Sequence, residues 1–80
     1  MGIRLLGKNK IHSKEKDKDF FILYIDYPSD DPDLGRISDK KFVSEDIFNQ
    51  VNKKMYDHEI DFEWSMLGRY PTIKGIKILN

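Results

Sequence analysis

The chain has eighty residues with fourteen basic and fourteen acidic side chains, so no net positive charge draws it to nucleic acid. We expect one domain over residues 1–80, and because a domain this small buries only roughly 60 to 65% of its unfolded surface, we expect a homodimer. Cysteine is absent, which excludes disulfides and thiolate metal sites, and the aromatic content of 12% is too high for a disordered segment.

Hydropathy gives the expected location. The sequence shows neither a secretion signal nor the ~20 consecutive apolar residues that cross a bilayer. We therefore expect a soluble, cytoplasmic protein that does not associate with membranes.

The first half of the chain predicts three strands. The first runs from residue 3 to residue 6 or 11, and the wholly polar stretch that follows is a charged hairpin loop or a flexible arm. The second, FFILYIDY at residues 20–27, is the strongest because aromatic and β-branched side chains dominate it. PSDDPDLG at residues 28–35 then imposes a long turn, and RISDKKFV at residues 36–43 is the third strand.

An amphipathic helix is predicted over residues 44–55. Ser44 is a natural N-cap with acidic residues in the first turn after it, while Lys53 and Lys54 would lie in the last turn, so the charges match the helix dipole. Four apolar residues at helical spacing form one stripe facing the core, namely Ile47, Phe48, Val51 and Met55.

Two further strands end the chain. HEIDFEWS alternates strictly, with Ile60, Phe62 and Trp64 on one face, which predicts a half-buried strand. PTIKGIKIL predicts another, but its alternation slips near Gly75, where a β-bulge or a barrel bend is expected. The order strand, strand, strand, helix, strand, strand predicts a mostly β fold, a five-stranded OB-like small barrel; the alternative is an open α+β sheet with one helix.

Motifs for catalysis or metal binding are lacking in the sequence. His12 and His58 lie in different predicted elements, and neighbouring residues of DHE on a strand point to opposite faces. SDDPD lacks the spacing and terminal glutamate of a calcium loop, and LLGKNK lacks the second glycine of a phosphate-binding loop. We therefore expect no enzyme, no catalytic residues, no metal and no cofactor.

The second strand offers a surface for stacking. One of its faces carries Phe20 and Tyr24, and the opposite face carries more aliphatic residues. A small domain rarely buries both faces, so Phe20 and Tyr24 are candidates for the outer face, where aromatic rings can stack on bases. Alternatively, both rings pack under the charged loop, against the helix or in a dimer interface.

The C-terminal hairpin, with FEW, the tip SMLGRYP and the returning strand TIKGIKIL, resembles that of the filamentous-phage single-stranded DNA-binding proteins, a family of small dimeric OB-like barrels. The matching positions are Gly68, Arg69 and Tyr70 at the tip, then the alternating Ile76, Lys77 and Ile78. The resemblance implies that Tyr70 touches DNA, that Arg69 lies beside phosphates, and that Tyr24 is the aromatic residue of an outer strand. The sequence departs from the family at Pro71, in a shorter final strand and in a clearer helix.

Together these features predict a sequence-tolerant binder of single-stranded DNA, or of RNA, from a phage or mobile element, acting in DNA replication. It would use aromatic stacking and a basic groove. The candidate nucleic-acid-binding residues are Phe20, Tyr24, Lys10, Arg36, Arg69, Tyr70, Lys74 and Lys77.

Two other functions stay open. A protein-interaction module, inhibitor or accessory factor would use the acidic face of Asp61 and Glu63 and the acidic turn at residues 30–33. A small RNA-binding or translation-associated barrel is the third. If the protein is a dimer, the apolar tip residues Met66 and Leu67 would pair with their own copies across a two-fold axis.

Overall fold

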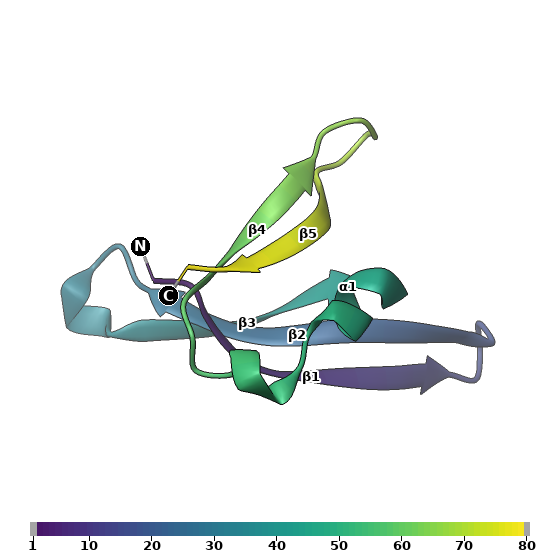
Figure 1. The fold of residues 1–80 in the computed structure, drawn as a ribbon, viewed down its shortest axis with the longest axis horizontal. Helices are drawn as coiled ribbons and strands as arrows, with labels where there is room; N and C mark the ends of the chain where they lie inside the picture. Colours follow the sequence, from purple (N-terminus) through teal and green to yellow (C-terminus); the bar gives the residue numbers. More distant parts are fainter. Residues whose placement is uncertain (1, 80) are drawn as a thin grey trace.

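Three long antiparallel strands form the first sheet of the computed structural model, which describes residues 2–79 (Figure 1). They are β1 (Arg4–Ser13), β2 (Lys18–Pro28) and β3 (Arg36–Val43), in the order β1-β2-β3. The three strands predicted in the first half are thus confirmed, and the first runs as far as Ser13. The charged stretch after it is a hairpin turn over residues 14–17, in which Asp17 adopts φ 49°.

The turn between β2 and β3 is organised by aspartate, proline and glycine, the residue types that predicted it. It contains the 3-10 turn η1 (Pro32–Leu34), whose N-cap Asp31 accepts a hydrogen bond from the Asp33 N–H at 3.0 Å. Gly35 follows with φ 74°, a conformation that glycine adopts readily because it has no Cβ. The reversed chain then pairs with β2 along all eight residues of β3.

The predicted helix begins where expected but is shorter. Helix α1 (Glu45–Gln50) is N-capped by Ser44, whose Oγ accepts from the Ile47 N–H at 3.4 Å. Val51 is extended, and a separate 3-10 turn, η2 (Lys53–Met55), begins after Asn52, whose side chain accepts from the Lys54 N–H at 3.0 Å. The prediction of one helix to residue 55 was therefore wrong, because the Asn52 side chain offers the backbone a local alternative to the helix.

Lys8 of β1 fixes the end of α1. Its Nζ donates to the carbonyl oxygens of Phe48 at 2.9 Å and Val51 at 2.7 Å, and it lies 4.3 Å from the centre of the Phe48 ring. A cation at the C-terminal carbonyls suits the negative end of the helix dipole. The charge expected from Lys53 and Lys54 is thus supplied from a different element.

The second sheet is the hairpin of β4 (Ile60–Ser65) and β5 (Thr72–Ile78). Glu63 lies opposite Gly75 and Trp64 opposite Ile73, which leaves Lys74 as the extra residue of a bulge. The bulge lies next to Gly75, as the slipped alternation predicts. An isolated bridge between Arg4 and Glu59 joins the base of this hairpin to β1, and the Leu5 N–H donates to the His58 carbonyl at 3.2 Å beside it.

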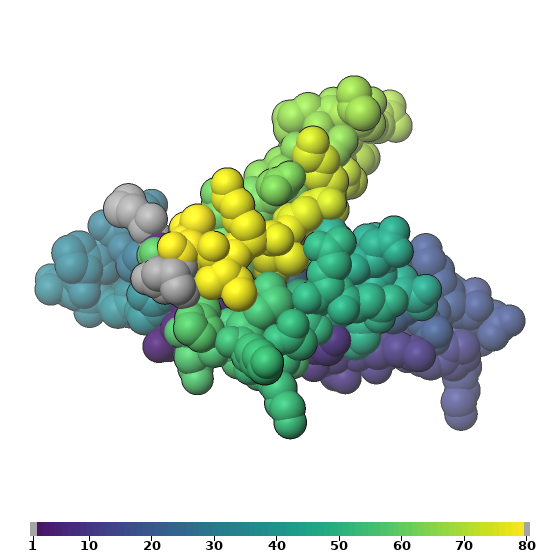
Figure 2. Space-filling view, in the orientation of Figure 1, coloured from purple at the N-terminus to yellow at the C-terminus, as the bar shows by residue number. Residues whose placement is uncertain are grey.

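The fold is mostly β, with its strands in two open sheets of three and two strands. A closed barrel, the leading expectation, is not what residues 2–79 form, and the open alternative fits. The start of β4 already lies beside β1, where the Ile60 N–H donates to the Ile3 carbonyl at 2.8 Å, so closure would need a ladder between the remaining edges, β3 and β5. Within residues 2–79 the ladders are those of β1 with β2, β2 with β3 and β4 with β5. The hairpin instead stands away from the sheet (Figure 2).

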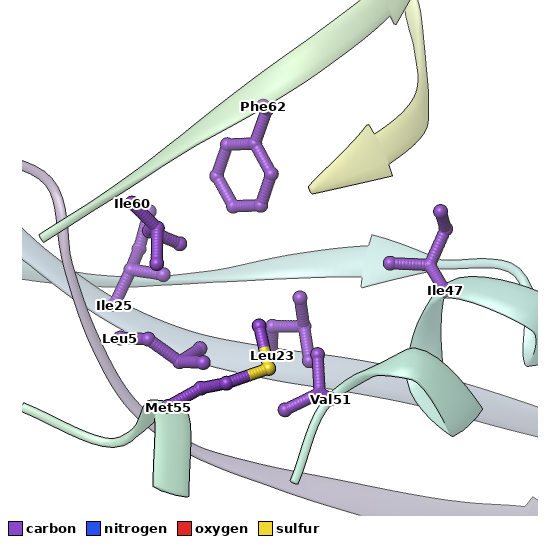
Figure 3. Packing of buried hydrophobic residues seen from close by; sticks show 8 residues of the cluster. All are labelled: Leu5, Leu23, Ile25, Ile47, Val51, Met55, Ile60 and Phe62. Atoms are coloured by element: carbon purple, nitrogen blue, oxygen red, sulfur yellow. The ribbon is translucent and has the colours of Figure 1, made fainter. Parts of the chain in front are cut away.

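The hydrophobic core lies between the first sheet, the helical segment and the base of the hairpin (Figure 3). We call the sheet face that carries Leu5, Leu23 and Ile25 the inner face. The predicted stripe from the helical segment packs on it, with Phe48 only half-buried. The buried cluster comprises Leu5, Leu23, Ile25, Ile47, Val51, Met55, Ile60 and Phe62.

Asp26 ties the ends of the three long strands together. This carboxylate, only 8% exposed, accepts hydrogen bonds from Arg4 of β1 at 2.7 and 3.2 Å and from Arg36 of β3 at 2.8 and 3.1 Å. The hydrogen bonds from Arg4, and then those from Arg36, lower the pKa of Asp26 against the opposing effect of burial.

Candidate nucleic-acid interface

The face of the first sheet opposite the core, which we call the outer face, gathers aromatic side chains from two strands. Phe20 and Tyr24 point to it because they alternate with the inner residues of β2. Residues directly opposite in neighbouring strands share a face, so Ile11 joins them opposite Phe20, and Lys40 opposite Tyr24. Phe42, opposite Ile22, completes the set.

The rings form a partly exposed platform. Phe20 and Phe42 meet edge to face with their centroids 6.1 Å apart, and Phe42 is 59% exposed. Tyr24 is 36% exposed, and its hydroxyl accepts from Asn9 Nδ2 at 3.3 Å. Ile22 is buried on this side of the sheet. The expectation that Phe20 and Tyr24 share the face away from the core agrees with this placement.

Three lysines surround the platform. The Nζ atoms of Lys16 and Lys18 lie 5.8 and 5.5 Å from the centre of the Phe20 ring, and Lys40 Nζ lies 5.9 Å from that of Phe42. At these distances the cation–π attraction is weak, so the ammonium groups stay available to bind an anion such as a phosphate group. The outer face therefore combines exposed aromatic rings with lysine ammonium groups that lie less than 6 Å from the ring centres.

The other predicted site residues lie elsewhere. Lys10 is opposite Phe21, hence on the inner face, and its Nζ is 3.8 Å from a carboxylate oxygen of Asp19. Arg36 is engaged by Asp26 and also donates to the Gly2 carbonyl at 2.6 Å. The remaining four belong to the second hairpin: Arg69, Tyr70, Lys74 and Lys77.

The eight predicted residues are thus distributed over four places, and only Phe20 and Tyr24 belong to the aromatic platform. Arg36 alternates onto the same side of the sheet but lies at the other end of β3, bound to Asp26. Ile11 and Phe42 were missed, although a signal for Phe42 exists. Alternate residues of RISDKKFV share one side of the strand, namely Arg36, Ser38, Lys40 and Phe42. If this strand is paired with the second strand, Phe42 comes to lie next to Phe20.

The histidines and carboxylates offer no metal cage in the described structure. His12 Nδ1 lies 2.8 Å from an Asp19 carboxylate oxygen in the β1–β2 hairpin. Among residues 2–79, no group of three or more His, Cys, Asp or Glu side chains is placed to hold a metal ion. Over the same residues, no helix combines the length and apolar character needed to cross a bilayer.

Comparison with known proteins gives no match, whether with family models, curated proteins or solved structures.

The tip of the second hairpin presents apolar side chains to solvent. Leu67 is 99% exposed, and Met66 and Tyr70 are both more than two-thirds exposed. If Leu67 pairs with its own copy in a homodimer, Leu67→Gln should weaken self-association about tenfold, because a central apolar contact carries much of an interface's energy. Sedimentation equilibrium measures the change.

The matched control is Leu34→Gln, a change of the same type at an exposed leucine of η1. It should leave self-association unchanged. A wild-type chain that stays monomeric at millimolar concentration, or a Leu67→Gln variant that associates like wild type, contradicts the expectation.

Proposed function

We propose that the protein binds single-stranded nucleic acid, with single-stranded DNA as the leading ligand, on the outer face of its first sheet. The observation that carries the proposal is the platform of Phe20, Phe42 and Tyr24 with lysine ammonium groups above its rings. Stacking on such rings contributes about 1 to 3 kcal/mol per base and requires bases that are not already paired.

Stacking on this platform predicts tolerance of sequence. Every base has a π-face, so rings discriminate little between bases, whereas lysines contact phosphates, which carry no sequence information. Three lysines near the rings correspond to about three phosphate contacts. The logarithm of affinity should therefore fall with the logarithm of salt concentration with a slope of about −2.

The hairpin tip adds a second part to the proposal. Arg69 and Tyr70 are exposed there, as contact with a nucleic acid requires. The resemblance of this hairpin to the filamentous-phage proteins supports a role for both residues, and it supports the wider proposal of a dimeric phage or mobile-element protein acting in DNA replication.

The acidic face has less support as a binding surface. Asp61 lies opposite Lys77 across the β4–β5 ladder, so an opposite charge interrupts that face. In the acidic turn, Asp31 caps η1. These carboxylates have structural partners, whereas the aromatic platform has open ring surface.

Fluorescence anisotropy of a labelled oligo-thymidine of about twelve nucleotides tests the proposal. We expect micromolar affinity at ~50 mM salt, reversal by added salt, and much weaker binding of a duplex of the same length. Oligo-uridine measured in parallel decides between DNA and RNA. Absence of binding at low salt, or equal binding of the duplex, would show the proposal to be wrong.

A further inference from the structure

A groove of about 880 Å³ separates the end of the first sheet from the second hairpin. Its sheet side is formed by the beginning of β2 and the end of β3, and its hairpin side by Trp64 and the start of β5. The hairpin leans away from the sheet as it rises toward its tip (Figure 1). The apolar side chains that line it are Phe20, Phe21, Phe42, Val43, Trp64 and Ile73.

Trp64 is the aromatic side chain that the hairpin contributes to the groove. It lies edge to face with the buried Phe62, with ring centroids 6.2 Å apart, and it remains 46% exposed. The contact with Phe62 holds the indole in place from one side, so the ring does not have to be ordered when a ligand stacks on it. Alternation places Trp64 on the face of Ile60 and Phe62, but Trp64 lies near the end of β4, where the hairpin leans away from the sheet (Figure 1).

The charges along the groove cancel. Lys18 and Lys41 are balanced by Asp19 and Glu45, and Asp19 is itself engaged by His12 at 2.8 Å. A groove that is mainly apolar, aromatic and without net charge suits a flat uncharged ring better than a phosphate. It therefore differs in chemistry from the outer face, where lysines surround the rings.

The groove and the outer face are continuous. Phe20 and Phe42 line the groove and also form the platform, and Lys18, 5.5 Å from the centre of the Phe20 ring, lines the groove as well. Phe42 belongs to β3, which pairs with β2 on one side only within the described chain. A strand of nucleic acid can thus pass over Phe42 from one surface to the other without losing aromatic contact.

We propose that this groove seats an unstacked nucleobase of the same single strand that lies on the outer face, with Trp64 as its stacking platform. The inference depends on the proposed function. The base enters between Trp64 and Phe42, while its phosphates stay at the mouth beside Lys18 and Lys41. A paired base cannot enter, so the groove adds to the preference for single strands.

Two independent readouts test the inference on the intact chain. Anisotropy of a labelled oligo-thymidine of about twelve nucleotides reports binding wherever it occurs, and the fluorescence of Trp64, the only tryptophan, reports the groove. We expect the oligonucleotide to quench Trp64 and to protect it from acrylamide. Trp64→Ala should weaken binding about tenfold, and Trp64→Phe should retain most of the affinity.

Leu34→Ala is the control, since this exposed leucine of η1 neither lines the groove nor belongs to the hairpin tip. It should bind like wild type. If anisotropy shows binding while Trp64 is neither quenched nor protected, the groove is not a base site, although the outer-face proposal survives. This outcome needs no variant, so a Trp64→Ala chain that fails to fold does not affect it. If anisotropy shows no binding at all, the proposed function itself is wrong.

Discussion

Replacing Asp26 with asparagine is expected to lower the free energy of unfolding by about 2 kcal/mol. The substitution removes the negative charge that forms ion pairs with Arg4 of β1 and Arg36 of β3, so both guanidinium groups lose their carboxylate partner. The two arginine side chains are 44% and 41% exposed, so water compensates them in part, and the loss stays below that of a fully buried ion pair. Urea unfolding at neutral pH measures the difference.

The same contact predicts the response to acid. Because the pKa of Asp26 is lowered in the folded protein, the unfolded chain binds this proton more readily, and stability rises with pH in that range. The contribution is complete above the unfolded pKa, about pH 4, and it is lost as the pH falls through the lower folded pKa. Stability of the Asp26→Asn variant should therefore change less than that of wild type below about pH 4.

Asp30→Asn is the matched control, because Asp30 lies in the exposed β2–β3 turn. It should alter unfolding by less than about 0.5 kcal/mol. If Asp26→Asn and wild type are equally stable both at neutral pH and below about pH 4, the contact of Asp26 with Arg4 and Arg36 has no structural role.

Local patterns predicted most of the fold, and contacts distant in sequence account for the rest. Alternation and β-branched composition located the strands, and the N-cap at Ser44 located the helix start. The helix end combines the local hydrogen bond of the Asn52 side chain with a distant one, because Lys8, some forty residues earlier, donates to the carbonyls of Phe48 and Val51 (|i−j| of 40 and 43). Closure of a barrel would likewise depend on a ladder between β3 and β5, and no local pattern reports whether such a ladder forms.

In the candidate site, too, local patterns located some residues, whereas others depend on contacts that are distant in sequence. Counting aliphatic residues on each side of one strand was enough to place Phe20 and Tyr24 together. To include Phe42 among the residues of the outer face, the register between β2 and β3 must be known. To exclude Lys10 from them, one must know which face of β1 it occupies. Arg36 looked like a free cation because its partner, Asp26, is ten residues away on the neighbouring strand.

The largest expected effect on binding comes from the platform itself. Tyr24→Ala and Phe42→Ala should each weaken binding of oligo-thymidine by about 1 to 3 kcal/mol, because each removes a ring on which a base stacks. Tyr70→Ala at the hairpin tip should do the same if the tip contacts the strand. All three side chains are partly or largely exposed, so thermal stability should stay nearly unchanged. Anisotropy titrations and thermal melts measure the two quantities.

Lys40→Gln separates charge from stacking on the same face. It keeps a long polar side chain opposite Tyr24 but removes one cation, so the salt dependence should become shallower by about 0.7. Leu34→Ala, an exposed apolar residue away from this face, should change neither affinity nor salt dependence. Tyr24→Ala or Phe42→Ala could instead unfold part of the protein, while the fraction that remains folded binds oligo-thymidine as tightly as wild type. In that case the ring stabilises the fold and does not bind nucleic acid. The platform then loses its proposed role, because a ring needed for packing is not available for a base.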